Sequence, residues 1–358
     1  MTILVLNAGS SSLKYAAFDA ALRCVAGGQA AGLGEGRSHA EAVAEALAAL
    51  GGAPVSAIAH RIVHGGPSLT AAAEIDAATR ALIEGAAPLA PLHNPPALAA
   101  LDAAAAALPG ARHVAVFDTA FHATNPEVAR RYALPERPET AGLRRYGFHG
   151  ISYSGLVRAL PILSGAPLPR RLLACHLGAG ASLCAILEGR SAATTMGYSP
   201  LDGLTMAGRA GALDPEAVLT LAERVGVPAA RALLNGGAGL RGLAGTGDMR
   251  ALLADPSPEA AFAVEHFCYW AVRHAGSMIA AMGGLDAVAF TGGIGERAAP
   301  IRSRIMTGLG WAGLAADAAA NEAGGPRLHA AGSPVSAWIV PAEEEAEIAR
   351  SAAALLAR

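Results

Sequence analysis

Residues 3–18 read ILVLNAGSSSLKYAAF, and this stretch decides the fold. An apolar run over 3–6 leads into a turn rich in Gly and Ser, and strand-like composition resumes from Leu13 to Phe18. Two such runs around a Gly/Ser turn predict a strand, a turn and a second strand. The chain is therefore expected to open with a β-hairpin.

The same pattern occurs again at 172–187, which reads LLACHLGAGASLCAIL. An offset of 169 residues places His176 on Asn7 and Gly178 on Gly9. A strand–loop–strand unit that occurs once in each half of the chain indicates an internal duplication.

Helical periodicity and short apolar runs alternate along the rest of the chain, which predicts an α/β protein. The predicted helices cover 39–50, 71–86, 95–108, 215–234, 258–283 and 343–358, and the predicted strands cover 56–59, 113–117 and 286–290. A length of 358 residues favours two domains.

Composition narrows the class of ligand. A net charge of −2 and a pI near 6.6 give no basic surface for nucleic acid or anionic membrane, so a small molecule is the expected partner. The first residues contain no basic leader segment, and no apolar stretch is long enough to span a bilayer, which predicts a cytoplasmic protein without membrane contact. The four cysteines show no CxxC spacing and are expected to be reduced thiols.

Three Gly-rich turns each follow an apolar strand, at 7–12, 178–180 and 292–295. Glycine lets backbone N–H groups approach phosphate oxygens, and no GxxxxGK[ST] motif is present. Lys14 is the single lysine among 27 basic residues and stands at the first turn, where an ammonium group suits a phosphate; chance survival in an Arg-rich composition is the alternative. Two such hairpins resemble the phosphate loops of actin/hexokinase/Hsp70-type ATPases.

Four polar residues stand in turns bounded by Gly or aromatic residues, where an ordinary role on a solvated helix face is disfavoured. They are Arg61, Asp118, His149 and Arg209. Asp118 follows a predicted strand directly, at the end of the sheet where α/β proteins place their sites.

Ten motifs now carry a specific resemblance. They are VLNAGSSSLKY, HRIVHGG, PLHNPP, VFDTAFH, YGFHGISY, CHLGAGAS, TTMGYSPLDGL, GDMR, FTGGIGE and VPAEEE, between Val5 and Glu345. In this order they resemble the acetate/propionate kinase family. The resemblance implies a duplicated RNase H-like (actin-like ATPase) α/β fold with an interdomain cleft, and a homodimer. It also implies a first domain over 1–121 plus 345–358 and a second, nucleotide-binding domain over 122–344.

The resemblance also implies roles for individual residues. Those that would contact ATP or ADP are Asn7, Ser10, Ser12, Lys14, His176, Gly178, Gly180, Asp248, Met249, Arg250, Gly293, Ile294 and Glu296. Those implied in phosphoryl transfer are Arg61, Asp118, His149 and Arg209. Those implied around the acid are Arg61, Val63, Leu92, His93, Phe148 and Pro200. Mg²⁺ (or Mn²⁺) would be bound or oriented by Asn7, Asp118 and Glu344.

The implied reaction is reversible, Mg²⁺-dependent phosphoryl transfer between ATP and acetate, direct and in line, which gives acetyl phosphate and ADP. Val63 favours acetate over longer acids, while propionate or another short acid is the first alternative. The second is a non-catalytic sensor of nucleotide or acyl phosphate. It is motivated by departures from the family pattern at Ala179 and Ala212; further departures stand at Ala181 and Arg297.

Overall fold

The computed structural model describes residues 2–9, 11–34 and 36–358, so the predicted phosphate contact Ser10 lies outside the described residues. The chain forms two compact units. The first contains the residues up to Ala123 together with Phe148–Gly155 and Glu343–Arg358, and the second contains Thr124–Gly147 and Leu156–Ala342. The domain limits 1–121 plus 345–358 and 122–344 stay a prediction. In the described part of the chain, no helix is both long and apolar enough to cross a membrane.

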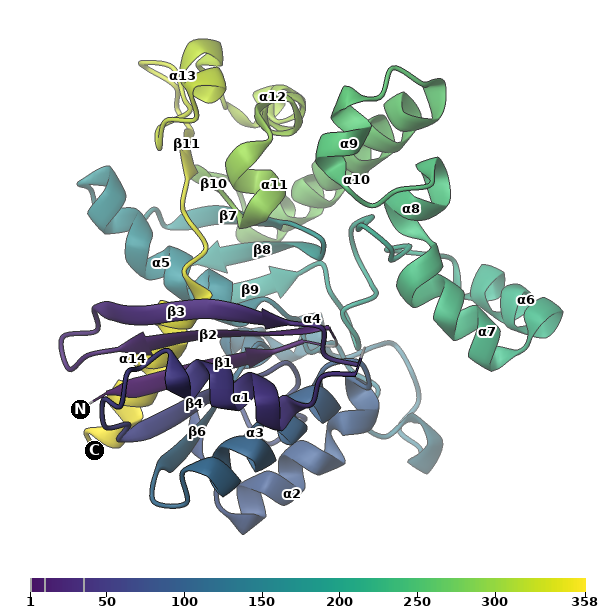
Figure 1. The fold of residues 1–358 in the computed structure, drawn as a ribbon. Coiled ribbons are helices and arrows are strands. Elements are labelled where there is room, and N and C mark those ends of the chain that lie inside the picture. Colours follow the sequence, from purple (N-terminus) through teal and green to yellow (C-terminus); the bar gives the residue numbers. More distant parts are fainter. Residues whose placement is uncertain (1, 10, 35) are drawn as a thin grey trace. The chain divides into compact units, whose positions relative to one another are not determined.

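The first unit is built on one mixed sheet with the strand order β3-β2-β1-β4-β6-β5 (Figure 1). Its strands are β1 (Ile3–Ala8), β2 (Ser12–Phe18), β3 (Cys24–Ala31), β4 (Ala57–Ile62), β5 (Ala73–Glu74) and β6 (Arg112–Phe117). Its helices are α1 (His39–Ala48), α2 (Ala77–Gly85), α3 (Asn94–Ala107) and α14 (Glu344–Leu356). Strands β1, β4 and β6 run parallel, so their C-terminal ends lie at one edge of the sheet.

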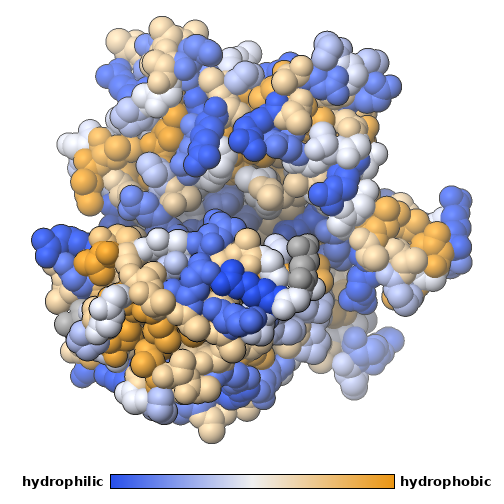
Figure 2. All heavy atoms as spheres, in the orientation of Figure 1, coloured by the Kyte–Doolittle hydropathy of each residue, from blue (hydrophilic) through white to orange (hydrophobic). Residues whose placement is uncertain are grey.

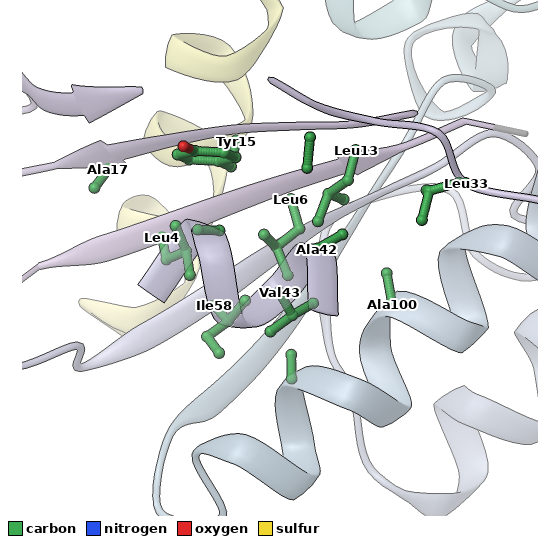
Figure 3. Packing of buried hydrophobic residues seen from close by; sticks show 13 residues of the cluster. Leu4, Leu6, Leu13, Tyr15, Ala17, Leu33, Ala42, Val43, Ile58 and Ala100 are labelled. Carbon is green, nitrogen blue, oxygen red and sulfur yellow. The ribbon is translucent and has the colours of Figure 1, made fainter. Parts of the chain in front are cut away.

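Two apolar layers hold this sheet between helices. On one face Leu4, Leu6 and Ile58 pack with Val43 of α1 and Ala100 of α3 (Figure 3). On the other face α14 packs against the sheet in a second apolar layer, whose buried residues include Ile3, Val5, Ala57, Ala59, Val114, Ile348, Ala349 and Ala352. Alternate residues of a strand point to opposite faces, which explains why neighbouring residues of β1 and β4 divide between the two layers. These layers fix where the ends of β1, β4 and β6 lie.

The second unit is built on a sheet with the order β11-β10-β7-β8-β9. Its strands are β7 (Arg171–Leu177), β8 (Ala181–Leu187), β9 (Arg190–Thr194), β10 (Ala287–Thr291) and β11 (Ser336–Ile339). Its helices are α4 (Glu127–Arg130), α6 (Pro215–Val225), α7 (Val227–Ala232), α8 (Gly239–Ala244), α9 (Met249–Ala254), α10 (Pro258–Met282), α11 (Gly292–Arg297), α12 (Ala299–Gly308) and α13 (Ala318–Ala323). Helix α5 (Gly150–Ser164) begins in the first unit and continues into the second.

The two sheets repeat one topology, which supports the duplication predicted from the sequence. In each, an antiparallel three-strand meander is followed by two parallel strands, β1-β2-β3 with β4 and β6, and β7-β8-β9 with β10 and β11. Ala8 pairs with Leu13 in the first hairpin and Leu177 with Ala181 in the second, so the second turn is one residue shorter. The offset of 169 residues therefore holds only up to the turn.

Three predicted elements differ in the structure. The segment 71–86 is a short strand followed by α2, whose start is fixed by Asp76, which accepts a hydrogen bond from the Thr79 N–H. The predicted helix 215–234 is broken at Gly226, whose φ of 82° a helix cannot contain. The Gly-rich segment 292–295 is the first turn of α11 rather than an open turn.

Candidate active site

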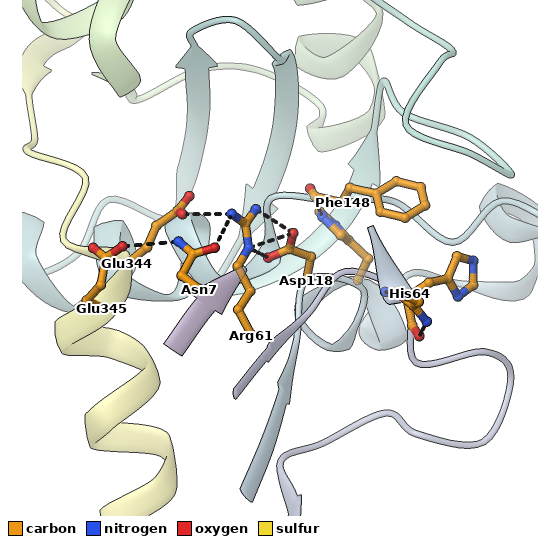
Figure 4. Close-up of polar contacts among 9 residues, drawn as sticks. Asn7, Arg61, His64, Asp118, Phe148, Glu344 and Glu345 are labelled. Carbon is orange, nitrogen blue, oxygen red and sulfur yellow. Dashed lines mark hydrogen bonds and ion pairs between the residues drawn. The ribbon is translucent and has the colours of Figure 1, made fainter. Parts of the chain in front are cut away.

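The centre of the first unit's polar cluster is Arg61, which stands near the end of β4 (Figure 4). Its Nε lies 3.3 and 3.2 Å from the two carboxylate oxygens of Asp118, and its Nη2 lies 2.7 Å from Oδ2. Its Nη1 donates to Asn7 Oδ1 at 3.2 Å and lies 3.4 Å from Glu344 Oε2. The structure thus brings together Asn7, Arg61, Asp118 and Glu344, four of the predicted site residues.

The ends of three parallel strands and the start of one helix supply these groups. Asn7 comes from β1, Arg61 from β4, Asp118 follows β6, and Glu344 is the first residue of α14. Parallel strands end at one edge of a sheet, and ligand sites of open α/β sheets lie there. The topology therefore explains why residues more than 50 positions apart meet.

Burial and charge act against each other within the cluster. Asp118 is only 1% exposed, and this burial raises its pKa to about 6 against the opposing effect of the Arg61 guanidinium. For Arg61, burial disfavours the charge, but the carboxylates of Asp118 and Glu344 outweigh it and raise the pKa. The guanidinium of Arg61 therefore lies between the carboxyl groups of Asp118 and Glu344.

A fifth residue of the cluster, Glu345, was missed by the sequence analysis. Its Oε1 accepts a hydrogen bond from Asn7 Nδ2 at 3.1 Å, while Asn7 Oδ1 serves Arg61. Both ends of the Asn7 amide are thus engaged, which fixes its orientation. The signal in the sequence is the acidic run VPAEEE, in which Glu345 directly follows the predicted metal-binding residue Glu344.

The loop that follows β4 is held by buried hydrogen bonds. The His64 N–H donates to Asn94 Oδ1 at 3.1 Å, and Asn94 Nδ2 donates to the His64 carbonyl at 3.0 Å. The Gly66 N–H donates to His64 Nδ1 at 2.9 Å, and the His64 ring packs edge-on against Phe148. Two predicted acid-pocket residues, Val63 and Phe148, are buried beside these contacts.

Three other predicted acid-pocket residues, Leu92, His93 and Pro200, differ from Val63 and Phe148 in their burial or in the unit to which they belong. Leu92 is 52% exposed, and His93 is partly buried at the start of α3. Pro200 belongs to the second unit, where its carbonyl accepts a hydrogen bond from Arg209 Nη1 at 3.0 Å. Val63 and Phe148 are therefore the members of the predicted pocket that the first unit buries.

His149 has an unusual backbone conformation. Its φ is +59°, a region that residues other than glycine adopt mainly at strained or functional positions. The next residue, Gly150, donates its N–H to the Asp118 carbonyl at 2.8 Å, and any side chain on it would collide with that carbonyl. The strained turn therefore brings the backbone at His149 close to that of Asp118.

The first hairpin turn carries the remaining predicted phosphate contacts of this unit. Lys14 is exposed and pairs with Asn7 across β1 and β2, so the two side chains lie on the same side of the sheet. Ser12 is the first residue of β2, and its carbonyl accepts from the Gly9 N–H at 2.8 Å.

The second unit contains a pocket of about 540 Å³, which is in the usual range for a small-molecule site. It is lined by Gly178, Ala179, Gly247, Asp248, Met249, Arg250, Leu253, Gly293, Ile294, Arg297, Ala298 and Pro300. Six of these were predicted as nucleotide contacts, namely Gly178, Asp248, Met249, Arg250, Gly293 and Ile294. The predicted contacts His176, Gly180 and Glu296 do not line it; Gly180 accepts from the Gly178 N–H within the turn, at 2.9 Å.

The two arginines of the pocket differ in their partners. Arg250 Nη2 lies 3.1 Å from Asp248 Oδ2, and the same carboxylate caps α9 by accepting the Arg250 N–H. Among the described residues, none forms a hydrogen bond or ion pair with the side chain of Arg297, which is exposed. Arg297 therefore supplies the pocket with a guanidinium group that is not paired with a carboxylate of any described residue.

Arg209 lies in a loop of the second unit. Its Nη1 donates to the Pro200 carbonyl and lies 3.6 Å from Met206 Sδ. Gly239 has φ of +62°, and a Cβ on it would stand 2.5 Å from the Arg209 carbonyl oxygen, so this loop needs glycine there. The loop that carries Arg209 is thus held by backbone contact with the start of α8.

The chain matches the model of the Acetokinase family over residues 21–350. It is 42% identical to the acetate kinase of Rhodopseudomonas palustris (strain TIE-1), an alignment that covers 97% of this chain and 96% of that protein. The crystal structure of Porphyromonas gingivalis acetate kinase superposes with a TM-score of 0.90 at 33% identity and covers 99% of both chains. The crystal structure of a propionate kinase from Francisella tularensis subsp. tularensis SCHU S4 superposes with a TM-score of 0.91 at 31% identity and covers 98% of both chains.

These similarities confirm the predicted fold class, a duplicated actin-like ATPase fold, and the predicted family. Both extend over nearly the whole chain, so they apply to both units. The chain belongs to the acetokinase family of kinases that transfer phosphate to a carboxylate.

Proposed function

We propose that this kinase transfers the terminal phosphoryl group of ATP to acetate, reversibly, and gives acetyl phosphate and ADP. The observation that carries the proposal is the cluster of Arg61 with Asp118, Glu344 and Asn7. The relatives support the choice of acid, because those from Rhodopseudomonas palustris and Rhizobium meliloti carry the name acetate kinase.

The chemistry needs charge neutralisation more than proton transfer. An acetate acceptor is already ionised at neutral pH, so no general base has to activate it. Catalysis then consists of aligning the two substrates and stabilising negative charge on the phosphoryl oxygens. We assign this stabilisation to the guanidinium groups of Arg61 and Arg209 and to the imidazole of His149. We expect the phosphoryl group to pass directly and in line from ATP to acetate, without a phosphoenzyme intermediate.

The oxygen-rich cluster suits Mg²⁺ or Mn²⁺ bound with the nucleotide. Among the residues that the structure describes, no three His, Cys, Asp or Glu side chains converge as a complete metal site. Mg²⁺ in phosphotransferases typically takes only one or two protein carboxylates together with phosphate oxygens and water. Asp118 and Glu344, with the amide of Asn7, would hold such an ion, which neutralises phosphate charge when bound.

The pocket of the second unit is proposed to hold ATP or ADP. Met249, Leu253 and Ile294 supply apolar surface for a base, and Arg250 and Arg297 supply positive charge. Ala179 stands in this lining and Ala181 is buried in β8, so neither offers a side-chain donor to phosphate. We therefore expect this turn to contact phosphate through backbone N–H groups alone.

Val63 and Phe148 are proposed to limit the size of the acid. One methylene group in an apolar pocket is worth about 1–3 kcal/mol, so a well-packed wall favours acetate over propionate only moderately. Propionate is the second candidate substrate, since one similar structure is a propionate kinase. The values of kcat/KM for the two acids decide between them. A kcat/KM for propionate equal to or higher than that for acetate would reject acetate as the preferred acid.

The departures at Ala179 and Ala212 leave a non-catalytic sensor as the alternative from another class. A coupled assay of acetyl phosphate with ADP and MgCl₂ separates the two. Turnover well above that of an Arg61→Ala control excludes a sensor, whereas nucleotide binding without turnover contradicts the proposed reaction.

A homodimer is proposed through the exposed face of α10. Phe262 and Tyr269 are seven residues apart, hence on one side of the helix, and are 55% and 62% exposed. Aromatic residues are enriched at subunit interfaces.

A second apolar area lies over α6 and α7, where Leu219, Val225 and Val227 are exposed (Figure 2).

Light scattering after gel filtration tests this interface. Tyr269→Arg should convert a dimer into a monomer, while Leu219→Glu on the other apolar area should leave it unchanged. The reverse pattern would transfer the interface to α6 and α7, and a monomeric wild type would reject the dimer. The cytoplasmic location stays a prediction.

A further inference from the structure

Glu296 is a predicted nucleotide contact, but in the structure its carboxylate accepts hydrogen bonds from backbone N–H groups. A single oxygen, Oε1, accepts the Gly292 N–H at 3.0 Å and the Ala342 N–H at 2.9 Å. The side chain is thus bound to two segments that are 50 residues apart in the sequence and belong to the same unit.

The first of these segments is the start of α11, which forms one wall of the pocket. The N–H groups of a helix's first turn have no partner within the helix. Thr291, at the N-cap position, makes no side-chain capping bond, and Glu296 reaches back to Gly292 instead. The residues that follow, Gly293, Ile294 and Arg297, line the pocket. The carboxylate therefore holds the wall of the pocket at the end where the glycines lie.

The other end of α11 is held by a buried arginine. Arg302 Nη1 donates to the carbonyls of Gly295 and Glu296 at 3.1 and 2.8 Å, and its Nε donates to Asn321 Oδ1 at 2.9 Å. Arg302 is 1% exposed. Arg302 thus fixes the backbone of Glu296 without using the Glu296 carboxylate. That carboxylate can therefore bind the second segment, at Ala342.

The second segment leads directly to the cluster of the first unit. Ala342 is the last residue of the second unit, and Glu344, two residues later, begins α14 and lies 3.4 Å from Arg61. We propose that Glu296 is a positioning residue, which ties the pocket wall formed by α11 to the chain segment that leads to Glu344. This inference rests on the proposed function, which assigns nucleotide binding to the pocket and phosphoryl transfer to the cluster of Arg61. It predicts that nucleotide affinity and turnover depend on the same side chain, although Glu296 does not line the pocket.

The two accepted hydrogen bonds give the inference a sharp test. Glutamine keeps an oxygen in the place of Oε1 but removes the charge, whereas alanine removes both bonds. Glu296→Gln should therefore stay within about threefold of wild type in ATP affinity, measured by calorimetry with MgCl₂, and in kcat with acetate. Glu296→Ala should weaken ATP binding about tenfold and lower kcat by a similar factor. Glu223→Ala, an exposed glutamate on α6, is the matched control.

Hydrogen–deuterium exchange of the same proteins supplies a readout that needs no turnover. The Gly292 and Ala342 amides should exchange faster in Glu296→Ala than in Glu296→Gln. Equal impairment of both variants would show that the negative charge itself is used, on a ligand, and would overturn the positioning role. Wild-type behaviour of Glu296→Ala would overturn it too. A wild type that binds ATP but does not phosphorylate acetate would reject the proposed function, while the exchange data would still decide the role of Glu296.

Discussion

The guanidinium of Arg61 forms a two-nitrogen contact with the carboxylate of Asp118, with Nη2 2.7 Å from Oδ2 and Nε within 3.3 Å of both oxygens. Asp118 is almost fully buried, whereas the Arg61 side chain is 20% exposed. The buried carboxylate thus orients the exposed part of the guanidinium. Because the geometry depends on a planar fork, lysine cannot reproduce it.

Arg61→Lys should therefore keep the positive charge and lose most of the activity. We expect kcat/KM for acetate to fall on the order of 10²–10³-fold, as when one preorganised donor is removed from a charge-stabilising site. Arg80→Lys is the matched control, since Arg80 makes a comparable pair with Asp102 on an exposed surface. An Arg61→Lys enzyme with near-normal kcat/KM would show that the fork geometry is not used.

Arg209→Ala tests the second proposed cation. We expect kcat to fall on the order of 10²–10³-fold. The fold should stay intact, because the backbone hydrogen bonds from Leu240 and Arg241 of α8 to this loop remain when the side-chain bond to Pro200 is lost. Circular dichroism verifies the fold, and Arg231→Ala, an exposed arginine on α7, serves as control. A rate close to wild type would remove Arg209 from the mechanism.

The sequence predicted much of the fold, because its signals were local. The paired hairpins, the strand ends and the long helix 258–283, observed as α10 with Gly283 in the left-handed conformation at its end, all followed from apolar runs and glycine positions. The helix expected over 71–86 failed because its first residues pair with β6 as a short strand. That pairing is a tertiary contact, which periodicity cannot report.

The candidate site was predictable only in part, for the same reason. Motifs identified Arg61, Asp118 and Glu344, which the structure brings together. The residues that support these sites are ordinary in sequence terms: Glu345, which binds Asn7, is one of three adjacent glutamates, and Arg302, which holds α11 of the second unit, lies in an unremarkable helix. Their roles depend on burial and on the direction of side chains, neither of which a single sequence reveals.

Val63→Ala tests the wall of the acid pocket. Val63 is 8% exposed, so the truncation removes two buried methyl groups and leaves space for a longer acid. We expect the ratio of kcat/KM for propionate to that for acetate to rise about tenfold, within the 10–200-fold range for one methylene group. Steady-state kinetics with both acids measure it, and an unchanged ratio would place the acid elsewhere.

Arg297→Ala tests the unpaired guanidinium of the proposed nucleotide pocket. We expect KM for ATP to rise about tenfold while KM for acetate is unchanged, because hydrogen bonds to charged groups are worth about 1.5–3 kcal/mol. Arg250→Ala should have a smaller effect, since Asp248 already neutralises that side chain. Equal effects of the two substitutions would contradict the distinction drawn from their partners.

The pair of His60 and His113 predicts how stability depends on pH. His60 Nε2 lies 3.0 Å from His113 Nδ1, and His60 is 1% exposed. Burial, with a smaller effect of His113, lowers the pKa of His60 to about 3, whereas an unfolded histidine has about 6.5. Between these values the unfolded chain binds a proton that the folded chain does not, so the free energy of unfolding falls as the pH falls below about 6.5.

His60→Leu should remove this contribution. The slope of the unfolding free energy against pH, measured by urea denaturation between pH 6 and pH 4.5, should become smaller by about 1.4 kcal/mol per pH unit. At pH 7.5 both proteins hold an uncharged group at this position, so the pH-dependent difference should vanish there. A slope equal to that of wild type would mean that His60 takes up its proton in the folded state, and that the buried pair opens to admit the charge.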